Sequence, residues 1–266
     1  MFRNNKYILL LILTFLCIFK NQIKGYLIIA NIIITIFPGS YFINRIVSMT
    51  TYSKYLCYLY HNNRLVYKNL NVISDLNSGY IIISNHVNVT DVNLIRNKID
   101  CHVVGKHSLI SKEYPYLNII NNIFFKNLKI IPYKRNSTKS GVVIKKKILE
   151  LVSKKMNVLI FPEGTSQKNC HNGILPFKKG LFHLAYKYNI KILPVVLYYT
   201  DKNYGLDKKT VFSPSYILKN NSTIYINFLN PFEPKNYLNT DNLVDTVYNK
   251  MNSIIKDYND KISETD

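Results

Sequence analysis

The sequence predicts an α/β fold in which helices cover a mixed, largely parallel sheet, with an apolar helical segment at the amino end. From residue 51 onward, short apolar runs alternate with amphipathic stretches. Most of these runs are continuous, which is typical of strands buried on both faces. Two long uncharged runs precede them. We therefore divide the chain into an apolar segment, residues 1–45, and a globular domain, residues 46–266.

The amino-terminal segment contains two uncharged apolar runs, residues 7–19 and 26–43, with basic residues beside the first. A helix needs about 20 apolar residues to span a bilayer, and Pro38-Gly39 interrupts the second run. No small-x-small cleavage site follows the first run, so we expect it to be retained. These features favour a membrane anchor, either a shallow hairpin or one span plus an interfacial helix. Two buried helices of a soluble core are the alternative.

The globular domain follows with six predicted strands and three predicted helices. The strands are expected at residues 80–84, 101–104, 128–133, 158–161, 192–199 and 223–228. Helices with one apolar face are expected at residues 141–155, 179–188 and 241–262. The last helix is expected to pack on the domain, and residues 202–218 are expected to form a long loop.

The composition and charge of the chain favour some classes of function and disfavour others. Lys and Arg outnumber Asp and Glu by 35 to 15, which gives a net charge of +20 and favours an anionic partner. Nucleic acid is disfavoured because no RNP-like or zinc-finger pattern is present and the charge is dispersed. The four cysteines are far apart and form no CxxC. They therefore predict neither a zinc site nor a disulfide framework, and they favour a reducing compartment.

A histidine and an aspartate follow the first predicted strand, as His86 and Asp91. Ligands bind at the carboxyl ends of strands in open α/β sheets. Five positions on a straight helix would separate the two side chains by about 140°, so they can meet only if the chain turns between them. His86 could then act as a general base while Asp91 fixes its tautomer. No Gly-x-Ser-x-Gly elbow is present, and Cys170 has no activating neighbour in sequence, so the nucleophile is expected to be the hydroxyl of a substrate.

Other polar groups follow further predicted strands. Glu163, Gly164 and Thr165 close the strand at 158–161 and offer a carboxylate, flexible backbone and a hydroxyl, although Pro-Glu-Gly is also an ordinary turn sequence. Arg135 ends another strand and could bind a phosphate through two hydrogen bonds. Lys106, after the strand at 101–104, could supply a second cation, although exposed lysines are usually solvated.

Four segments in order resemble blocks of the glycerolipid acyltransferases typified by 1-acyl-glycerol-3-phosphate acyltransferase. Residues 85–91, Asn-His-Val-Asn-Val-Thr-Asp, resemble the NHxxxxD box, and residues 131–135 resemble a second block that ends in arginine. Residues 161–165 resemble the FPEGT block, and residues 193–196 resemble a fourth block with proline and valine. The family often has Ser where this chain has Asn88, and Arg where it has Ser166.

The resemblance implies an acyltransferase catalytic domain at residues 46–266. His86 would be the catalytic base and Asp91 its orienting partner. Substrate-binding roles would fall to Asn85, Lys106, Arg135, Glu163, Gly164 and Thr165, with Lys106 and Arg135 on the acceptor phosphate. Acyl-CoA would be the donor cosubstrate, with no metal or cofactor, and the domain would lie on the cytosolic face of a membrane.

The acceptor implied is lysophosphatidic acid, which would give phosphatidic acid in phospholipid biosynthesis. Two alternatives stay open at this point. The first is an acyltransferase for another lysophospholipid, of the lysocardiolipin or lysophosphatidylinositol type. The second is a catalytically silent, membrane-anchored lipid-binding protein, motivated by Asn88 and Ser166, although the retained His86 and Asp91 argue against it.

Overall fold

The computed structural model of the chain describes residues 64–74, 79–88, 91–106, 129–134, 137–167, 169–201 and 223–264. The predicted apolar segment, the predicted loop at 202–218 and Arg135 lie outside these ranges. Within the described ranges, no helix combines the length and the apolar character needed to cross a bilayer. The predicted membrane anchor therefore stays a prediction.

The described residues form a mixed, largely parallel sheet of seven strands in the order β1-β7-β6-β2-β5-β3-β4. β6 and β7 pair antiparallel, and every other neighbouring pair is parallel. This arrangement confirms the sheet expected from the sequence. The strands are β1 (Arg64–Lys68), β2 (Ile81–Ser84), β3 (Cys101–Lys106), β4 (Ile130–Tyr133), β5 (Asn157–Ile160), β6 (Ile192–Tyr199) and β7 (Thr223–Phe228).

Six of these strands fall where the apolar runs predicted them, and β6 and β7 have the predicted bounds. β1 was not predicted. Its sequence, Arg-Leu-Val-Tyr-Lys, is short and partly exposed, and it pairs parallel with β7 at one end of the sheet order. An edge strand buries little apolar surface, so it lacks the continuous apolar run that marks the central strands.

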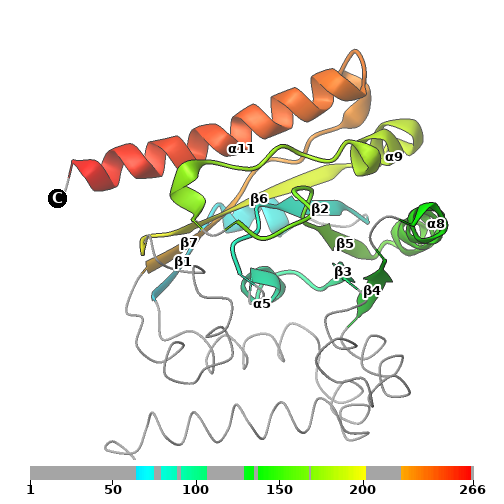
Figure 1. Ribbon diagram of the computed structural model, residues 1–266, viewed down its shortest axis with the longest axis horizontal. Helices are drawn as coiled ribbons and strands as arrows, with labels where there is room; N and C mark the ends of the chain where they lie inside the picture. Colours follow the sequence, from blue (N-terminus) through cyan, green and yellow to red (C-terminus); the bar gives the residue numbers. More distant parts are fainter. Residues whose placement is uncertain are drawn as a thin grey trace, which may run out of the picture.

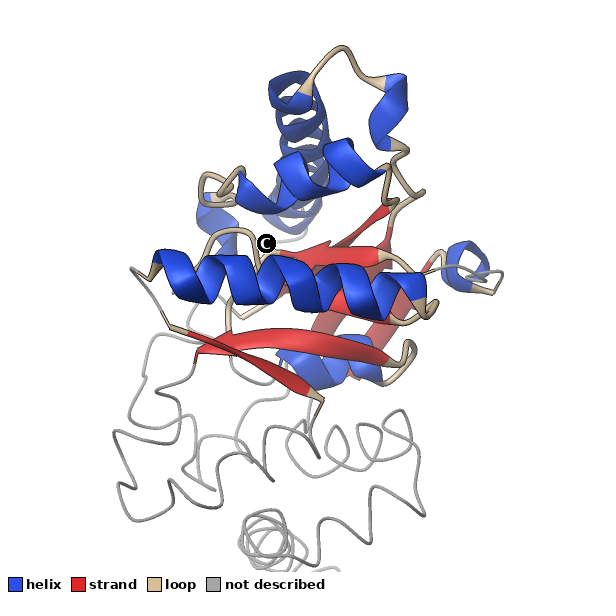
Figure 2. Ribbon diagram, turned by 90° about the vertical axis from the view of Figure 1, so that its right-hand side faces the viewer, coloured by secondary structure: helices blue, strands red, loops and turns tan. Residues whose placement is uncertain are grey.

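Helices cover both faces of the sheet (Figure 1). α9 (Gly180–Tyr188) and α11 (Thr240–Ser263) lie on one side, and α5 (Asp91–Arg96) lies on the other. α8 (Thr138–Ser153) packs on β4 and β5. The 3-10 helices are η1 (Leu70–Ile73), η3 (Cys170–Asn172) and η4 (Pro234–Asn236). Figure 2 shows the strands between the helices from a second direction.

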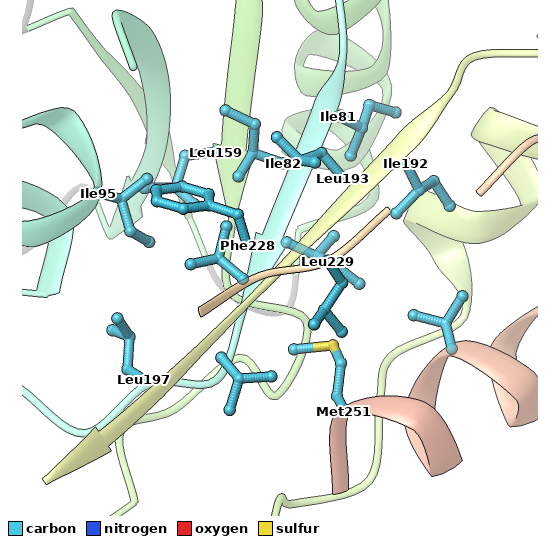
Figure 3. Packing of buried hydrophobic residues seen from close by; sticks show 14 of the residues in the cluster. Ile81, Ile82, Ile95, Leu159, Ile192, Leu193, Leu197, Phe228, Leu229 and Met251 are labelled. Atoms are coloured by element: carbon cyan, nitrogen blue, oxygen red, sulfur yellow. The ribbon is translucent and has the colours of Figure 1, made fainter. Parts of the chain in front are cut away.

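The core lies between the central strands and the helices on each face. Ile81, Leu159 and Leu193, from three neighbouring strands, have no exposed surface. Met251 extends from α11 toward the strands and is also fully buried (Figure 3). Burying such a side chain stabilises the fold by about 1.5–3 kcal/mol before entropy costs. This packing fixes the positions of β5, β2 and β6, whose carboxyl ends carry the site described next.

Candidate active site

The candidate site lies at one edge of the sheet. β6, β2 and β5 are neighbours and parallel, so their carboxyl ends meet at that edge. The loop after β2 carries His86, the turn after β5 carries Glu163, and Tyr199 is the last residue of β6. Residues more than 100 positions apart are thereby brought together, at the edge where ligands bind in open α/β sheets.

His86 and Asp91 meet because the chain turns between β2 and α5. The Nδ1 atom of His86 lies 2.9 Å from Oδ2 of Asp91. The same Oδ2 accepts the backbone N–H groups of Val87 at 2.7 Å and Asn88 at 2.9 Å. Asp91 has no exposed surface, so its charge depends on these donors instead of water. Since a carboxylate only accepts, Nδ1 carries the proton and Nε2 has the lone pair.

The His86 ring is held on one face and partly open to solvent. It stacks on Phe161, with 4.1 Å between the ring centroids. Its side chain is 22% exposed, and no residue in the described ranges is a hydrogen-bond partner of Nε2. The backbone is held as well: the His86 N–H donates to Glu163 Oε1 at 2.8 Å, and the His86 carbonyl accepts from Gln167 at 2.6 Å. The ring therefore presents a lone pair from a fixed backbone.

Glu163 connects two loops through a buried carboxyl group. Oε1 accepts the His86 N–H, and Oε2 accepts the Leu175 N–H at 3.1 Å. Burial raises the pKa of Glu163 to about 7, although these two hydrogen bonds act to lower it. Both oxygens already have backbone partners, so the geometry gives Glu163 a role in holding the loops. Its direct contact with the acceptor stays a prediction.

Gly164 is required by the backbone and by a neighbouring lysine. Its φ is +70°, in the left-handed region that favours glycine. A Cβ atom there would stand 2.5 Å from Nζ and 2.7 Å from Cε of Lys178. The backbone N–H of Lys178 also donates to the carbonyl of Pro162 at 2.9 Å. The exposed Lys178 side chain therefore lies across this turn. The sequence analysis did not identify Lys178 as a site residue, because no motif distinguishes it from Lys179 beside it.

The remaining predicted site residues differ in how they are placed. The Asn85 side chain exchanges two 2.8 Å hydrogen bonds with the backbone of Leu197 and so joins the end of β2 to β6. Thr165 is exposed on the turn after β5. Lys106 ends β3, which is parallel to β5, so its backbone lies at the same sheet edge. Arg135 lies outside the described residues. Substrate binding by these four residues stays a prediction.

Tyr199 is a second residue that the sequence analysis missed. Its hydroxyl donates to Oδ1 of Asp91, the oxygen that does not contact His86. Tyr199 ends a continuous apolar run, Ile-Leu-Pro-Val-Val-Leu-Tyr-Tyr, in which a tyrosine indicates only core packing. Its approach to Asp91 depends on the pairing of β6 with β2, which the sequence alone does not give.

The described residues contain no group of three His, Cys, Asp or Glu side chains that could hold a metal ion. Cys170 is buried near the site, and burial raises the pKa of its thiol to about 12. A thiol with this pKa stays protonated at neutral pH and is a poor nucleophile. The contact of His86 with Asp91 and the partial exposure of its ring support general-base catalysis by His86.

A family model described as Acyltransferase matches residues 60–198, just over half of the chain. This match includes His86, Asp91 and Glu163, and it ends one residue before Tyr199. The chain belongs to the Acyltransferase family.

Several curated relatives are named 1-acyl-sn-glycerol-3-phosphate acyltransferase. The relative from Saccharomyces cerevisiae is 31% identical over 163 residues, 59% of this chain and 48% of that protein. The relative from Borreliella burgdorferi is 30% identical over 47% of each chain. The relative from Escherichia coli is 27% identical over 48% of this chain and 50% of that protein. The chain spans about half the length of the curated relatives it matches.

A solved structure has the same fold. It is the crystal structure of the 1-acyl-sn-glycerophosphate (LPA) acyltransferase PlsC from Thermotoga maritima. The TM-score is 0.66 at 15% sequence identity, and the alignment covers 90% of this chain and 96% of that one. The mixed, largely parallel sheet with its helices is thus the PlsC-like fold.

Proposed function

We propose that this protein transfers a fatty acyl group from acyl-CoA to the free hydroxyl of lysophosphatidic acid, producing phosphatidic acid. The observation that carries the proposal is the His86 Nδ1 to Asp91 Oδ2 contact of 2.9 Å, with Nε2 left as a lone-pair nitrogen on a partly exposed ring. The names of the relatives support the choice of acceptor.

This geometry supports the following reaction. Nε2 of His86 removes the proton from the acceptor hydroxyl as its oxygen attacks the thioester carbonyl carbon. The buried Asp91 carboxylate stabilises the imidazolium that forms. The tetrahedral intermediate then collapses, the C–S bond breaks, and CoA leaves as a thiolate that can take the proton from His86. The products are an ester and a thiol.

The acceptor phosphate would be bound by cations at the same sheet edge. Lys178 supports this role because its side chain lies across the turn that also carries Phe161, the residue stacked on His86. It would supply positive charge near Ser166, where the family often has arginine. Lys106, the last residue of β3, and Arg135, which follows β4 in the sequence, would be further phosphate-binding residues.

The protein would act at a membrane surface. Its two amino-terminal apolar runs would anchor it beside lipid substrates. The net charge of +20 would favour anionic lipid, acyl-CoA and the acceptor phosphate. The catalytic domain would lie on the cytosolic face.

Replacement of His86 tests the proposed reaction. His86→Ala is expected to lower kcat for transfer of labelled acyl groups from acyl-CoA to lysophosphatidic acid by at least about 100-fold, because a positioned general base contributes about 10²–10⁴-fold. His183→Ala is the matched control, since His183 is exposed on α9 and its side chain contacts Thr240. It should retain wild-type turnover.

The same assay separates the candidate activities. Near-normal turnover by His86→Ala would overturn the mechanism. Wild-type turnover of lysocardiolipin or lysophosphatidylinositol, but not of lysophosphatidic acid, would reassign the acceptor. A wild-type protein that is silent with every acceptor, yet binds them, would be the lipid-binding alternative.

A further inference from the structure

We infer that Tyr199 is a positioning residue that fixes the orientation of the Asp91 carboxylate, so that Oδ2 stays on His86. The inference rests on the proposed function for its kinetic part only. Tyr199 is fully buried at the end of β6, and its hydroxyl donates to Oδ1 of Asp91. The two residues belong to different elements and are 108 positions apart in the sequence.

The two oxygens of Asp91 have different partners. Oδ2 accepts from the His86 ring and from the N–H groups of Val87 and Asn88. Oδ1 accepts from the Tyr199 hydroxyl. A carboxylate can rotate about its Cβ–Cγ bond and exchange its oxygens. A donor fixed on Oδ1 opposes that rotation and keeps the other oxygen in the plane of the imidazole.

The backbone of Tyr199 is itself held by hydrogen bonds to side chains of η3. Its carbonyl accepts from Nε2 of His171 at 2.8 Å, and its N–H donates to Sγ of Cys170 at 3.4 Å. Both partners belong to η3. Asn259 of α11 donates to the His171 carbonyl at 2.9 Å, which ties η3 to the carboxyl-terminal helix. The hydroxyl of Tyr199 therefore reaches Asp91 from a fixed backbone.

The hydroxyl also affects the charge that His86 experiences. A hydroxyl donor draws electron density from the carboxylate, so its removal leaves more negative charge facing the imidazole. Among the described residues, Glu163, on the turn after β5, and Cys170 on η3 also interact electrostatically with Asp91. Neither group contacts Oδ1 in any described hydrogen bond. Since the N–H groups of Val87 and Asn88 still hold Oδ2 near the ring, loss of the hydroxyl should favour the protonated form of His86 without changing its other neighbours.

Tyr199→Phe tests the inference, because it removes the hydroxyl and keeps the ring. We expect kcat to fall about 10-fold, the value typical of one hydrogen bond to a charged group. The acidic limb of the kcat/KM profile should move to higher pH, and KM for the acceptor should not change. Tyr199→Met, which also lacks the hydroxyl and adapts to core space, is made in parallel so that the result does not depend on the folding of one variant.

Tyr198→Phe is the matched control. Tyr198 is the neighbouring residue on β6 and is also fully buried, and its hydroxyl lies 2.9 Å from Asn259 Oδ1 and 3.1 Å from His171 Nδ1 instead of contacting Asp91. It should keep the wild-type kcat and pH profile. If Tyr199→Phe behaves like Tyr198→Phe in both measurements, Tyr199 is only a core residue and the inference is wrong.

A measurement without turnover separates this inference from the proposed function. Imidazole ¹⁵N signals of His86, assigned through His86→Ala, are followed through a pH titration of the wild-type protein and Tyr199→Phe. A shift of the His86 titration to higher pH in the variant supports the inference even if no acceptor is acylated. An unchanged titration overturns it, whatever the acylation assay shows.

Discussion

At the scale of single residues, Glu163 has a buried carboxyl group that connects two segments of the site. Its two carboxyl oxygens accept the N–H groups of His86 and Leu175, so one side chain joins the loop after β2 to the segment before α9. Only 5% of its surface is exposed. Burial, with no cation among its hydrogen-bond partners in the described ranges, raises the pKa of Glu163 to about 7. The stability of this sheet edge therefore depends on pH.

This pKa predicts the direction of a stability change. Between about pH 4.5 and pH 7, the unfolded chain has released the Glu163 proton while the folded protein still holds it. The contribution of Glu163 to stability therefore falls as the pH rises through this range and is constant above it. Glu163→Gln cannot titrate. The free energy of unfolding of wild type minus that of the variant should be about 2–3 kcal/mol larger at pH 5 than at pH 8.

Urea unfolding at the two pH values, followed by circular dichroism, measures this difference. Glu150→Gln is a suitable control, because Glu150 is exposed on α8 and its hydrogen bonds to Lys147 and Lys154 lower its pKa to about 2. Glu150 is charged at both pH values, so its replacement should cost the same at each. An equal cost of Glu163→Gln at pH 5 and pH 8 would contradict the pKa assigned to Glu163.

At the scale of elements, the turn after β5 and the residues before α9 act together. Lys178 and Lys179 are adjacent and exposed, but only Lys178 lies against Gly164. Lys179 forms an ion pair with Asp241 of α11 at 2.7 Å. The two adjacent side chains therefore extend to different parts of the molecule: Lys178 to the candidate site and Lys179 to α11.

This pair gives a controlled test of phosphate binding. Lys178→Met is expected to raise KM for lysophosphatidic acid about 10- to 100-fold, because it removes a cation that would contact the phosphate. KM for acyl-CoA should change less. Lys179→Met removes the same charge from the next position and should leave KM for the acceptor near its wild-type value. Equal effects of the two variants would show a general effect of surface charge.

The strands also show which sequence patterns were sufficient to predict them. β6 was predicted with its observed bounds although it contains Pro194, a residue that removes a donor from a ladder. β7 pairs with β6 only from Val195 to Tyr199, so Pro194 lies just beyond that pairing, where its carbonyl accepts from Leu229 at 3.0 Å. The continuous apolar run was therefore the stronger signal. β1 has no such run, and only its pairing with β7 identifies it.

At the scale of the whole molecule, membrane association is the main expectation from the sequence. Deleting residues 1–45 should move the protein from the membrane fraction to the supernatant, because these residues contain both long apolar runs. The fractionation should be carried out in low and in high salt, since a net charge of +20 alone can hold a protein on anionic lipid at low ionic strength. Turnover of a detergent-dispersed acceptor checks that the shortened protein is folded. Continued sedimentation in high salt would show that another surface anchors the protein.

The site as a whole was only partly predictable. The pairing of His86 with Asp91 could be anticipated, because His86 lies in the short loop after a recognisable strand and Asp91 begins the helix that follows this loop. Tyr199 and Lys178 could not, since their places depend on the pairing of β6 with β2 and on the path of the chain before α9. Sequence patterns report local environments, and contacts between distant segments require the three-dimensional arrangement.

The strand order has a consequence for how the protein is made. β2, β5 and β6 lie side by side, yet they are separated along the chain by more than 70 and more than 30 residues. During synthesis, His86 leaves the ribosome long before Tyr199, and β7 and α11 follow later still. The histidine and aspartate can meet early, but Tyr199 can join them only after β6 has left the ribosome.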